Sequence, residues 1–229
     1  MSTIVKSLPY RGDVTAAVGA GDTLAFVTAH PEGQPTALYR LDADKLNLQT
    51  TALPKGGSAL ALVGADYWVG GTDGFLYRCS PKGGPQALGE KLPHPPAALA
   101  PVAGGRLAVV AGSRLTLHGQ KDGKALQGFD LPDEGTCLSV DATGHWLAVG
   151  TAGGTVAVFE AETQDAFTPG EAAKLHEGRV TALSFEPDDL RFLSAGTDNK
   201  LLSTYARGKL EPEDRGRGNN HTEPVTAIV

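Results

Sequence analysis

Six histidines are the residues of this sequence with the widest chemical range, because imidazole serves as a metal ligand and as a general acid or base. None of them stands in a close ligand pair such as HxH or HExxH. Instead, His94, His176 and His221 each precede a short apolar run by four positions. This recurrent place indicates a structural role, and we expect no metal and no other cofactor.

Nucleophilic and phosphate-binding motifs do not occur in the sequence either. No GxSxG elbow, Walker loop or GxGxxG run opens a helical pattern, and the glycine-rich run Val69–Gly74 fits a hairpin turn. Cys79 and Cys137 lie in apolar runs without CxxC spacing, which is typical of buried free thiols in a reducing compartment. The sequence therefore predicts a cytoplasmic protein without catalytic residues, which is not an enzyme.

Charge and hydropathy narrow the classes of partner. The 229-residue chain carries a net charge of −6, whereas nucleic-acid affinity depends mainly on Lys and Arg side chains that neutralise phosphates. The charge thus argues against a nucleic-acid partner. No run approaches the roughly 18 apolar residues of a membrane-spanning helix, and residues 1–10 contain no secretory signal. We expect no membrane association.

The elements that must position these residues are short strands. In residues 176–205, the apolar runs Val180–Phe185, Arg191–Ala195 and Lys200–Tyr205 are separated by turns rich in Pro, Asp, Gly and Asn. Strands of five or six residues joined by such turns form an antiparallel meander. This stretch therefore predicts three neighbouring strands of one sheet.

The same pattern recurs along the whole chain. The first apolar residue of the third strand falls at Leu38, Leu76, Leu115, Val156 and Leu201, in steps of 38, 39, 41 and 45 residues. This is the spacing of β-propeller blades, and each interval has room for a fourth, outer strand. We expect an all-β, single-domain β-propeller over residues 1–229, with four-stranded antiparallel blades. The five complete blades are predicted at about 13–53, 57–92, 96–131, 135–175 and 179–210.

The two ends of the chain leave the closure of this propeller open. Residues 221–229 would begin an incomplete sixth blade, and residues 3–8 would form an outer clasp strand for it. One interpretation is that the chain is a piece of a longer protein. Alternatively, the propeller closes by a clasp between its N- and C-terminal segments, or its open edges associate with another copy.

Residues 176–205 resemble a WD repeat in the place of His176, in the run Leu193–Gly196 and in the turn residue Asp198. The resemblance covers most of the chain by period and the fifth blade by motif. It implies a buried hydrogen-bonded network of His176, Ser194 and Asp198. The family's tryptophan place in the third strand holds Thr204, and the Trp-Asp dipeptide does not occur in this sequence.

The predicted function is a non-catalytic scaffold that presents loops to a protein partner. In WD-repeat relatives, the loops before each first strand commonly contact partners. Here they carry Arg11, Lys55, His94, Arg179 and His221.

A second candidate surface is the polar segment 206–220. Arg215 and Arg217 of this segment would contact an acidic partner or a phosphate, unless the segment is merely a solvated loop. Two other functions remain open. One is a propeller enzyme with its active site in the central channel, and the other is a regulatory module of a larger multidomain protein.

Overall fold

Short apolar runs broken by glycine turns fold into β-strands. The computed structural model describes residues 13–29, 36–42, 44–45, 47–81, 83–163, 166–187, 189–214, 223 and 225. Several predicted features lie outside these residues, namely the clasp strand at 3–8, most of the segment 221–229, Arg11, Arg215, Arg217 and His221. None of the described residues forms a helix long and apolar enough to cross a membrane.

The described strands form five four-stranded antiparallel sheets. The first sheet contains β1 (Asp13–Ala20), β2 (Thr23–Ala29), β3 (Ala37–Asp42) and β4 (Asn47–Ala52). The second contains β5 (Gly57–Val63), β6 (Asp66–Gly71), β7 (Leu76–Cys79) and β8 (Pro85–Leu88), and the third β9 (Pro96–Val102), β10 (Arg106–Ala111), β11 (Arg114–Gly119) and β12 (Ala125–Asp130). The fourth contains β13 (Gly135–Val140), β14 (Trp146–Thr151), β15 (Thr155–Thr163) and β16 (Ala166–Lys174), and the fifth β17 (Val180–Phe185), β18 (Arg191–Gly196), β19 (Leu201–Tyr205) and β20 (Pro212–Asp214).

The expectation of an all-β chain with repeated four-stranded antiparallel sheets is confirmed. The fifth sheet differs from its predicted extent, because its fourth strand β20 pairs with β19 from within the segment that was predicted as a polar loop. Pro212, Glu213 and Asp214 give no apolar signal. An edge strand has solvent on one side, so polar residues and proline are tolerated there.

Tight turns between the second and third strands shape the second, fourth and fifth sheets. Gly74 and Gly154 occupy corresponding turn positions with φ of 87° and 88°, and Asn199 takes the same place in the fifth sheet with φ of 63°. Glycine adopts this left-handed conformation without steric cost, and asparagine tolerates it better than most other residues. The hairpins therefore repeat the same geometry although their sequences differ.

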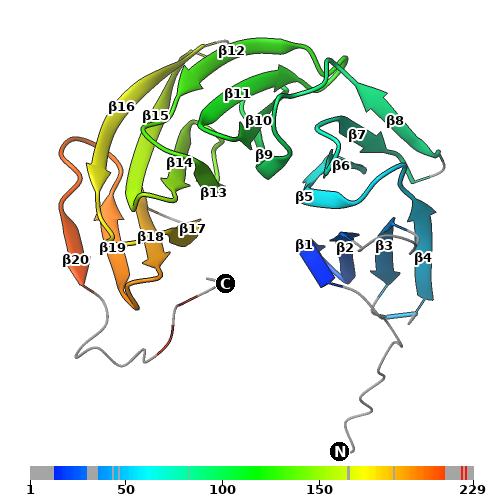
Figure 1. Cartoon of the computed structure of the whole chain (residues 1–229), viewed down its shortest axis with the longest axis horizontal. Coiled ribbons are helices and arrows are strands. Elements are labelled where there is room, and N and C mark those ends of the chain that lie inside the picture. Colours follow the sequence, from blue (N-terminus) through cyan, green and yellow to red (C-terminus); the bar gives the residue numbers. More distant parts are fainter. Residues whose placement is uncertain are drawn as a thin grey trace, which may run out of the picture.

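The sheets stand side by side around an arc in chain order, with the first strand of each on the inner side and the fourth on the outer side (Figure 1). Apolar side chains of consecutive sheets interdigitate in every gap between them. Between the third and fourth sheets, for example, Val110 and Leu117 pack with Val149 and Phe159. The core of the molecule is thus a series of layers between sheets.

A hydroxyl group connects neighbouring sheets at the inner side of the arc. The first two strands of each sheet have a register shift that leaves one residue of the first strand unpaired, and this residue is Thr15, Ser58, Ala97, Thr136 or Thr181. Thr136 Oγ1 lies 2.6 Å from the carbonyl oxygen of Val180 in the next sheet and 3.1 Å from that of Gly150 in its own sheet. We call this contact the hydroxyl latch.

The hydroxyl latch recurs at most of the described junctions. Thr15 Oγ1 lies 2.5 Å from the Gly57 carbonyl oxygen, and Ser58 Oγ lies 2.7 Å from that of Pro96. Thr181 Oγ1 donates to the carbonyl of Val225. Between two described sheets, the acceptor is the residue just before the unpaired position of the next sheet. Alanine at position 97 leaves the third sheet without this donor.

Close packing of a glycine against a bulky side chain accompanies the latch. A Cβ atom on Gly135 would lie 2.2 Å from Val110 Cγ1, and one on Gly150 would lie 2.6 Å from Val180 Cγ1. Gly57 meets Val27, and Gly70 meets Pro96, in the same way. Each described junction between two sheets therefore combines one glycine with one larger residue, which sets how closely the sheets approach.

Replacing Thr136 by Val is expected to lower the free energy of unfolding by about 1–3 kcal/mol, because partly buried carbonyl groups lose their hydroxyl donor. The measurement is denaturant unfolding. Thr50→Val, at an exposed position of β4, is the matched control and should change stability little. A Thr136→Val protein as stable as this control would contradict the role of the latch. Ala97→Ser, which supplies the absent hydroxyl, should raise stability.

Candidate interaction surface and buried histidine network

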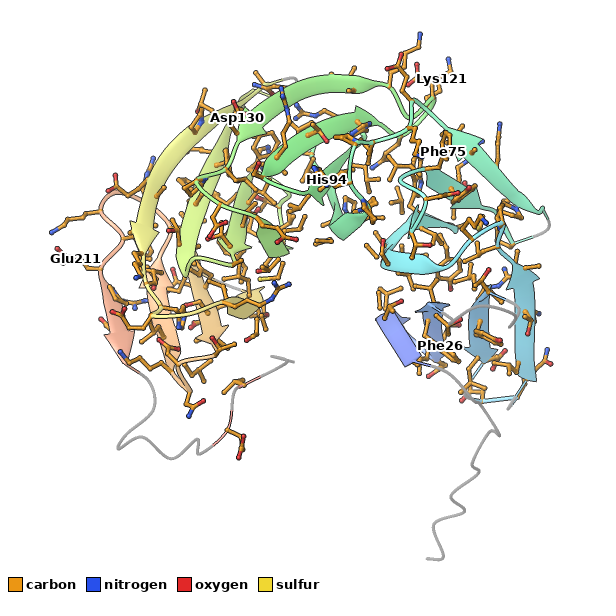
Figure 2. All side chains as sticks on the ribbon, viewed as in Figure 1. Phe26, Phe75, His94, Lys121, Asp130 and Glu211 are labelled. Atoms are coloured by element: carbon orange, nitrogen blue, oxygen red, sulfur yellow. The ribbon has the colours of Figure 1, made fainter. Side chains whose placement is uncertain are left out.

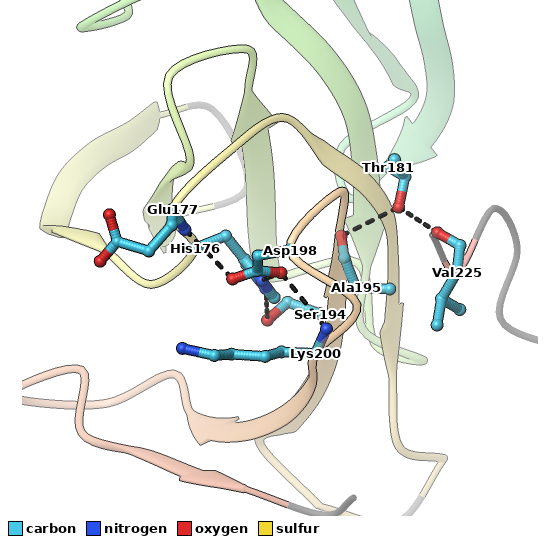
Figure 3. Close-up of polar contacts among 8 residues, drawn as sticks. All are labelled: His176, Glu177, Thr181, Ser194, Ala195, Asp198, Lys200 and Val225. Atoms are coloured by element: carbon cyan, nitrogen blue, oxygen red, sulfur yellow. Dashed lines mark hydrogen bonds and ion pairs between the residues drawn. The ribbon is translucent and has the colours of Figure 1, made fainter. Parts of the chain in front are cut away.

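The structure brings His176, Ser194 and Asp198 together between the fourth and fifth sheets (Figure 3). His176 Nδ1 lies 2.9 Å from Asp198 Oδ1, and Nε2 lies 2.9 Å from Ser194 Oγ. An ionised carboxylate only accepts hydrogen bonds, so Nδ1 carries the hydrogen. When the ring is neutral, Nε2 accepts the Ser194 hydroxyl hydrogen. We call these three residues the histidine network.

Asp198 is held as a carboxylate by several donors. Burial alone would raise the pKa of this carboxyl, but the hydrogen bond from His176 and those from the backbone N–H groups of Glu177 and Lys200 outweigh it. The pKa of Asp198 therefore lies below its ordinary value of 3.8. The carboxylate joins the connection before β17 to the turn after β18.

The histidine network has the donor–acceptor order of a Ser-His-Asp catalytic triad. A nucleophilic serine must reach a substrate, however, and the side chains of His176 and Ser194 are almost completely buried. They lie beside the apolar layer that contains Phe192 and Leu202. The network is thus a buried polar unit that fixes the end of the fifth sheet.

Thr204 stands at the third-strand position where a WD repeat has its tryptophan, and it adds no hydrogen bond to the histidine network. Thr204 pairs with Phe192 in the sheet, and its side chain is fully buried. Its Oγ1 has no hydrogen-bond partner in the part of the chain that the structure describes. The three-residue network therefore lacks the fourth member that the resemblance implies for a WD repeat.

Other sheets fill the corresponding positions differently. In the second sheet, the Tyr77 hydroxyl donates to Asp73 Oδ2 over 2.7 Å, and burial together with this carboxylate raises the pKa of Tyr77 to about 12. In the third sheet, His94 lies over Gly112 as His176 lies over Gly196. His94 is exposed, whereas His176 is buried.

The connections that lead into the first strands form one exposed face. Lys55, His94 and Arg179 are exposed at the entries to the second, third and fifth sheets, and the entry to the fourth sheet carries exposed Asp133 and Glu134. We call Lys55, His94, Glu134 and Arg179 the connector face. Figure 2 shows His94 toward the inner side of the arc, whereas Lys121 and Asp130 lie at its outer rim.

Backbone hydrogen bonds hold the connector face in place. The carbonyl of Gly56, next to Lys55, accepts the N–H of Thr72 over 2.7 Å. The carbonyls of Glu134 and Arg179 accept the corresponding N–H groups of the fourth and fifth sheets over 2.8 and 2.9 Å. The side chains of Lys55, Glu134 and Arg179 thus project from anchored backbone. Sequence reasoning missed the acidic member Glu134, whose signal was its place just before Gly135.

The face opposite the connector face has a groove around the turn after β13. A cavity of about 560 Å³ is lined by residues 100–103 and 138–144, and one of about 330 Å³ adjoins it toward Pro187 and Leu190. Asp141 fixes the turn, because its carboxylate accepts the N–H groups of Trp146 and Thr143. Burial would raise the pKa of Asp141, but hydrogen bonds from Thr143 and Trp146 lower it overall.

Other reactive groups are shielded. Cys79 and Cys137 are free thiols, and burial raises the pKa of both, to about 11 for Cys79. A thiol is nucleophilic as the thiolate, so neither residue is activated. Among the described residues, no group of three His, Cys, Asp or Glu side chains is placed to hold a metal ion.

Comparisons with known proteins give a fold and no family. No protein-family model matches the chain, and no curated protein sequence is similar to it. The crystal structure of the computationally designed Ika8 protein superposes with a TM-score of 0.73 at 19% sequence identity. The match covers 93% of this chain, which spans 64% of the length of that protein. At this identity the likeness concerns the fold alone.

Replacing Asp198 by Asn should lower the free energy of unfolding at pH 7 by about 1–3 kcal/mol, since the charged hydrogen bonds are lost. A carboxyl whose pKa is lowered on folding stabilises the protein above its ordinary value, 3.8 here, and loses this effect as the pH falls further. The difference between wild type and variant should therefore shrink below pH 4. Urea unfolding across pH measures it, and a difference independent of pH would refute the charged network.

The two buried hydroxyls of the fifth sheet should respond differently to removal. Ser194→Ala leaves His176 Nε2 without its partner and should cost about 1–3 kcal/mol of stability. Thr204→Val removes a hydroxyl that has no hydrogen-bond partner among the described residues. Since valine keeps the shape of threonine, this change should be neutral or stabilising. Thermal unfolding of both variants provides the comparison. Equal losses would show that Thr204 Oγ1 is bonded.

Proposed function

We propose that this chain is a non-catalytic protein-interaction scaffold, in which the sheets are blades of a β-propeller of the WD-repeat type. The observation that carries the proposal is the connector face. It presents exposed Lys55, His94, Glu134 and Arg179, and the backbone at or beside Lys55, Glu134 and Arg179 is anchored to the neighbouring turns. Pre-ordered polar side chains on a rigid scaffold lose little entropy when a partner binds.

The propeller proposal is supported by the order of the sheets. Consecutive sheets follow an arc, and their first strands lie on its inner side (Figure 1). The chain also superposes on the crystal structure of the designed Ika8 protein, which is longer than this chain. The histidine network supports a WD-type blade in the fifth sheet. The contact of Thr181 with Val225 repeats the hydroxyl latch, which supports a sixth blade that begins at Val225.

The chemistry of the connector face favours a protein as the partner. Lys55 and Arg179 are basic, whereas Glu134 between them in the order of the sheets is acidic. A phosphate backbone would be repelled by such acidic positions and by the net charge of −6. A protein surface with both signs of charge fits better. We further propose a cytoplasmic location, and Arg215 and Arg217 remain candidates for an additional contact.

Affinity capture with the full chain, followed by binding measurements on a recovered protein, tests the proposal. The double variant Lys55→Glu, Arg179→Glu should weaken binding about tenfold, because two favourable contacts become repulsive. Lys209→Glu changes an equally exposed charge on the connection between β19 and β20, at the opposite end of the sheets, and should have no effect. Equal affinity of wild type and of both variants would exclude the connector face.

If binding is instead lost on replacing Arg215 and Arg217 alone, the segment 206–220 is the contact site. The connector face would then be rejected while the scaffold function remained. No recurrent protein partner in any capture would reject the scaffold function itself.

A further inference from the structure

Exposed apolar side chains gather on the two sheets at the ends of the arc. The large hydrophobic side chains that are exposed among the described residues are Val14 (52%), Leu24 (42%), Leu126 (61%) and Tyr205 (40%). Val14 and Leu24 belong to the first sheet and Tyr205 to the fifth, whereas Leu126 lies on the outer strand β12. The first and fifth sheets thus carry three of these four residues.

Among the described sheets, the fifth sheet packs against the fourth with one face only; on its other face Leu193 and Leu201 are half-buried, Tyr205 is exposed and Ala195 is buried. Phe185, Phe192 and Leu202 pack against the fourth sheet. By the strand register, Leu193 and Leu201 point to the other side. The corresponding residues of the fourth sheet, Ala148 and Val156, are fully buried against the fifth. We call Leu193, Ala195, Leu201 and Tyr205 the forward face of the fifth sheet.

The first sheet has an apolar face on its opposite side. Leu24 and Leu41 are paired neighbours there. The corresponding residues of the second sheet, Tyr67 and Cys79, are buried against the first sheet. We call Val14, Leu24 and Leu41 the backward face of the first sheet. Both end faces therefore have the composition of faces that pack on another sheet elsewhere in the arc.

The two end faces also match in detail. Each internal junction combines a glycine with a bulky residue, such as Gly150 of β14 with Val180 of β17. At the corresponding places, the fifth sheet offers the small Ala195 and the first sheet offers Val14. The tripeptide Val14-Thr15-Ala16 repeats the sequence of Val180-Thr181-Ala182. The fifth sheet thus offers a first sheet the same pairing of a small residue with a valine that the fourth sheet offers the fifth.

The hydroxyl latch of the fifth sheet offers a hydrogen-bond donor to a sheet that packs on the forward face. Thr181 Oγ1 lies between the carbonyl of Ala195 and that of Val225 (Figure 3). Val225 opens a third copy of the same tripeptide. A backbone carbonyl is all that the hydroxyl requires, so the carbonyl of a Val14 residue can replace that of Val225.

We propose that the first sheet of a second copy of this chain packs on the forward face of the fifth sheet, with its Val14 carbonyl accepting the Thr181 hydroxyl in place of the Val225 carbonyl. The contact is head to tail, since one copy contributes its backward face and the other its forward face. It goes beyond the proposed scaffold function, because the connector face of each copy stays accessible.

Sedimentation velocity of the full chain over a range of concentrations tests the proposal. The mean mass should rise with concentration above the 23.7 kDa of one chain. A mass that stays at one chain throughout would overturn the proposal, and would leave the forward face to a different occupant, such as further sheets of the same type. Because the connector face is not involved, this result would not affect the scaffold function.

Charge variants identify the two faces. Leu24→Asp blocks the backward face and Tyr205→Asp blocks the forward face, and both positions are exposed enough to tolerate the change. Each variant alone should associate at least tenfold more weakly. Their mixture should form a one-to-one complex, because each variant keeps the face that the other lacks. Leu126→Asp is the control, and it should associate like wild type.

The mixture separates head-to-tail packing from other modes. If two like faces met, one of the single variants would still associate, and the mixture would gain nothing. That outcome would overturn the proposal, as would equal weakening by Leu126→Asp. Circular dichroism of each variant verifies folding, and Val14→Asp provides a second variant of the backward face at an exposed position.

Discussion

The contact between the first strands of consecutive sheets is the constraint on which this molecule depends. A single four-stranded sheet buries little of its own surface, so each one needs a neighbour on either side. Thr15, Ser58 and Thr136 bond to carbonyls of the following sheet, and a glycine meets a bulky residue beside each of these bonds. These contacts fix the distance between sheets at the inner side, while the outer strands diverge.

The polar groups at the ends of the sheets follow from this arrangement. Where a first strand enters beside its neighbour, backbone groups must be satisfied in a confined space. In the fifth sheet, the hydrogen-bonded pair His176 and Asp198 lies at this place, and in the second sheet the pair Tyr77 and Asp73 does. The third sheet has neither pair at this place. The same constellation that could activate a serine in an open cleft acts here as a buried support. The side chains left outside, on the connector face, are those available to a partner.

Much of the fold could be predicted from the sequence because the period of glycine turns and apolar runs is visible residue by residue. The strand bounds deviate where the physical signal is weak, as at the polar edge strand that contains Pro212. The histidine network could be named because His176, Ser194 and Asp198 keep the spacing of a known repeat.

Other features could not be predicted, because they depend on partners that differ in each sheet. The hydroxyl latch joins a Thr or Ser hydroxyl to a backbone carbonyl. Every residue has a backbone carbonyl, so the sequence does not indicate which one is the acceptor. The exposure of His94, in contrast to the burial of His176, is not visible in the sequence, where both histidines precede an apolar run by four positions. The apolar end faces become visible only when the register shows which side of a sheet is covered.

The central claim is that complementary contacts at the inner side hold neighbouring sheets together, and a double-mutant cycle on Gly135 and Val110 tests it most directly. A Cβ atom on Gly135 would collide with Val110 Cγ1, an atom that Val110→Ala removes. Gly135→Ala and Val110→Ala should each destabilise the protein. The double variant should then be more stable than the sum of the two losses predicts, by about 1–3 kcal/mol. Losses that simply add would contradict the account.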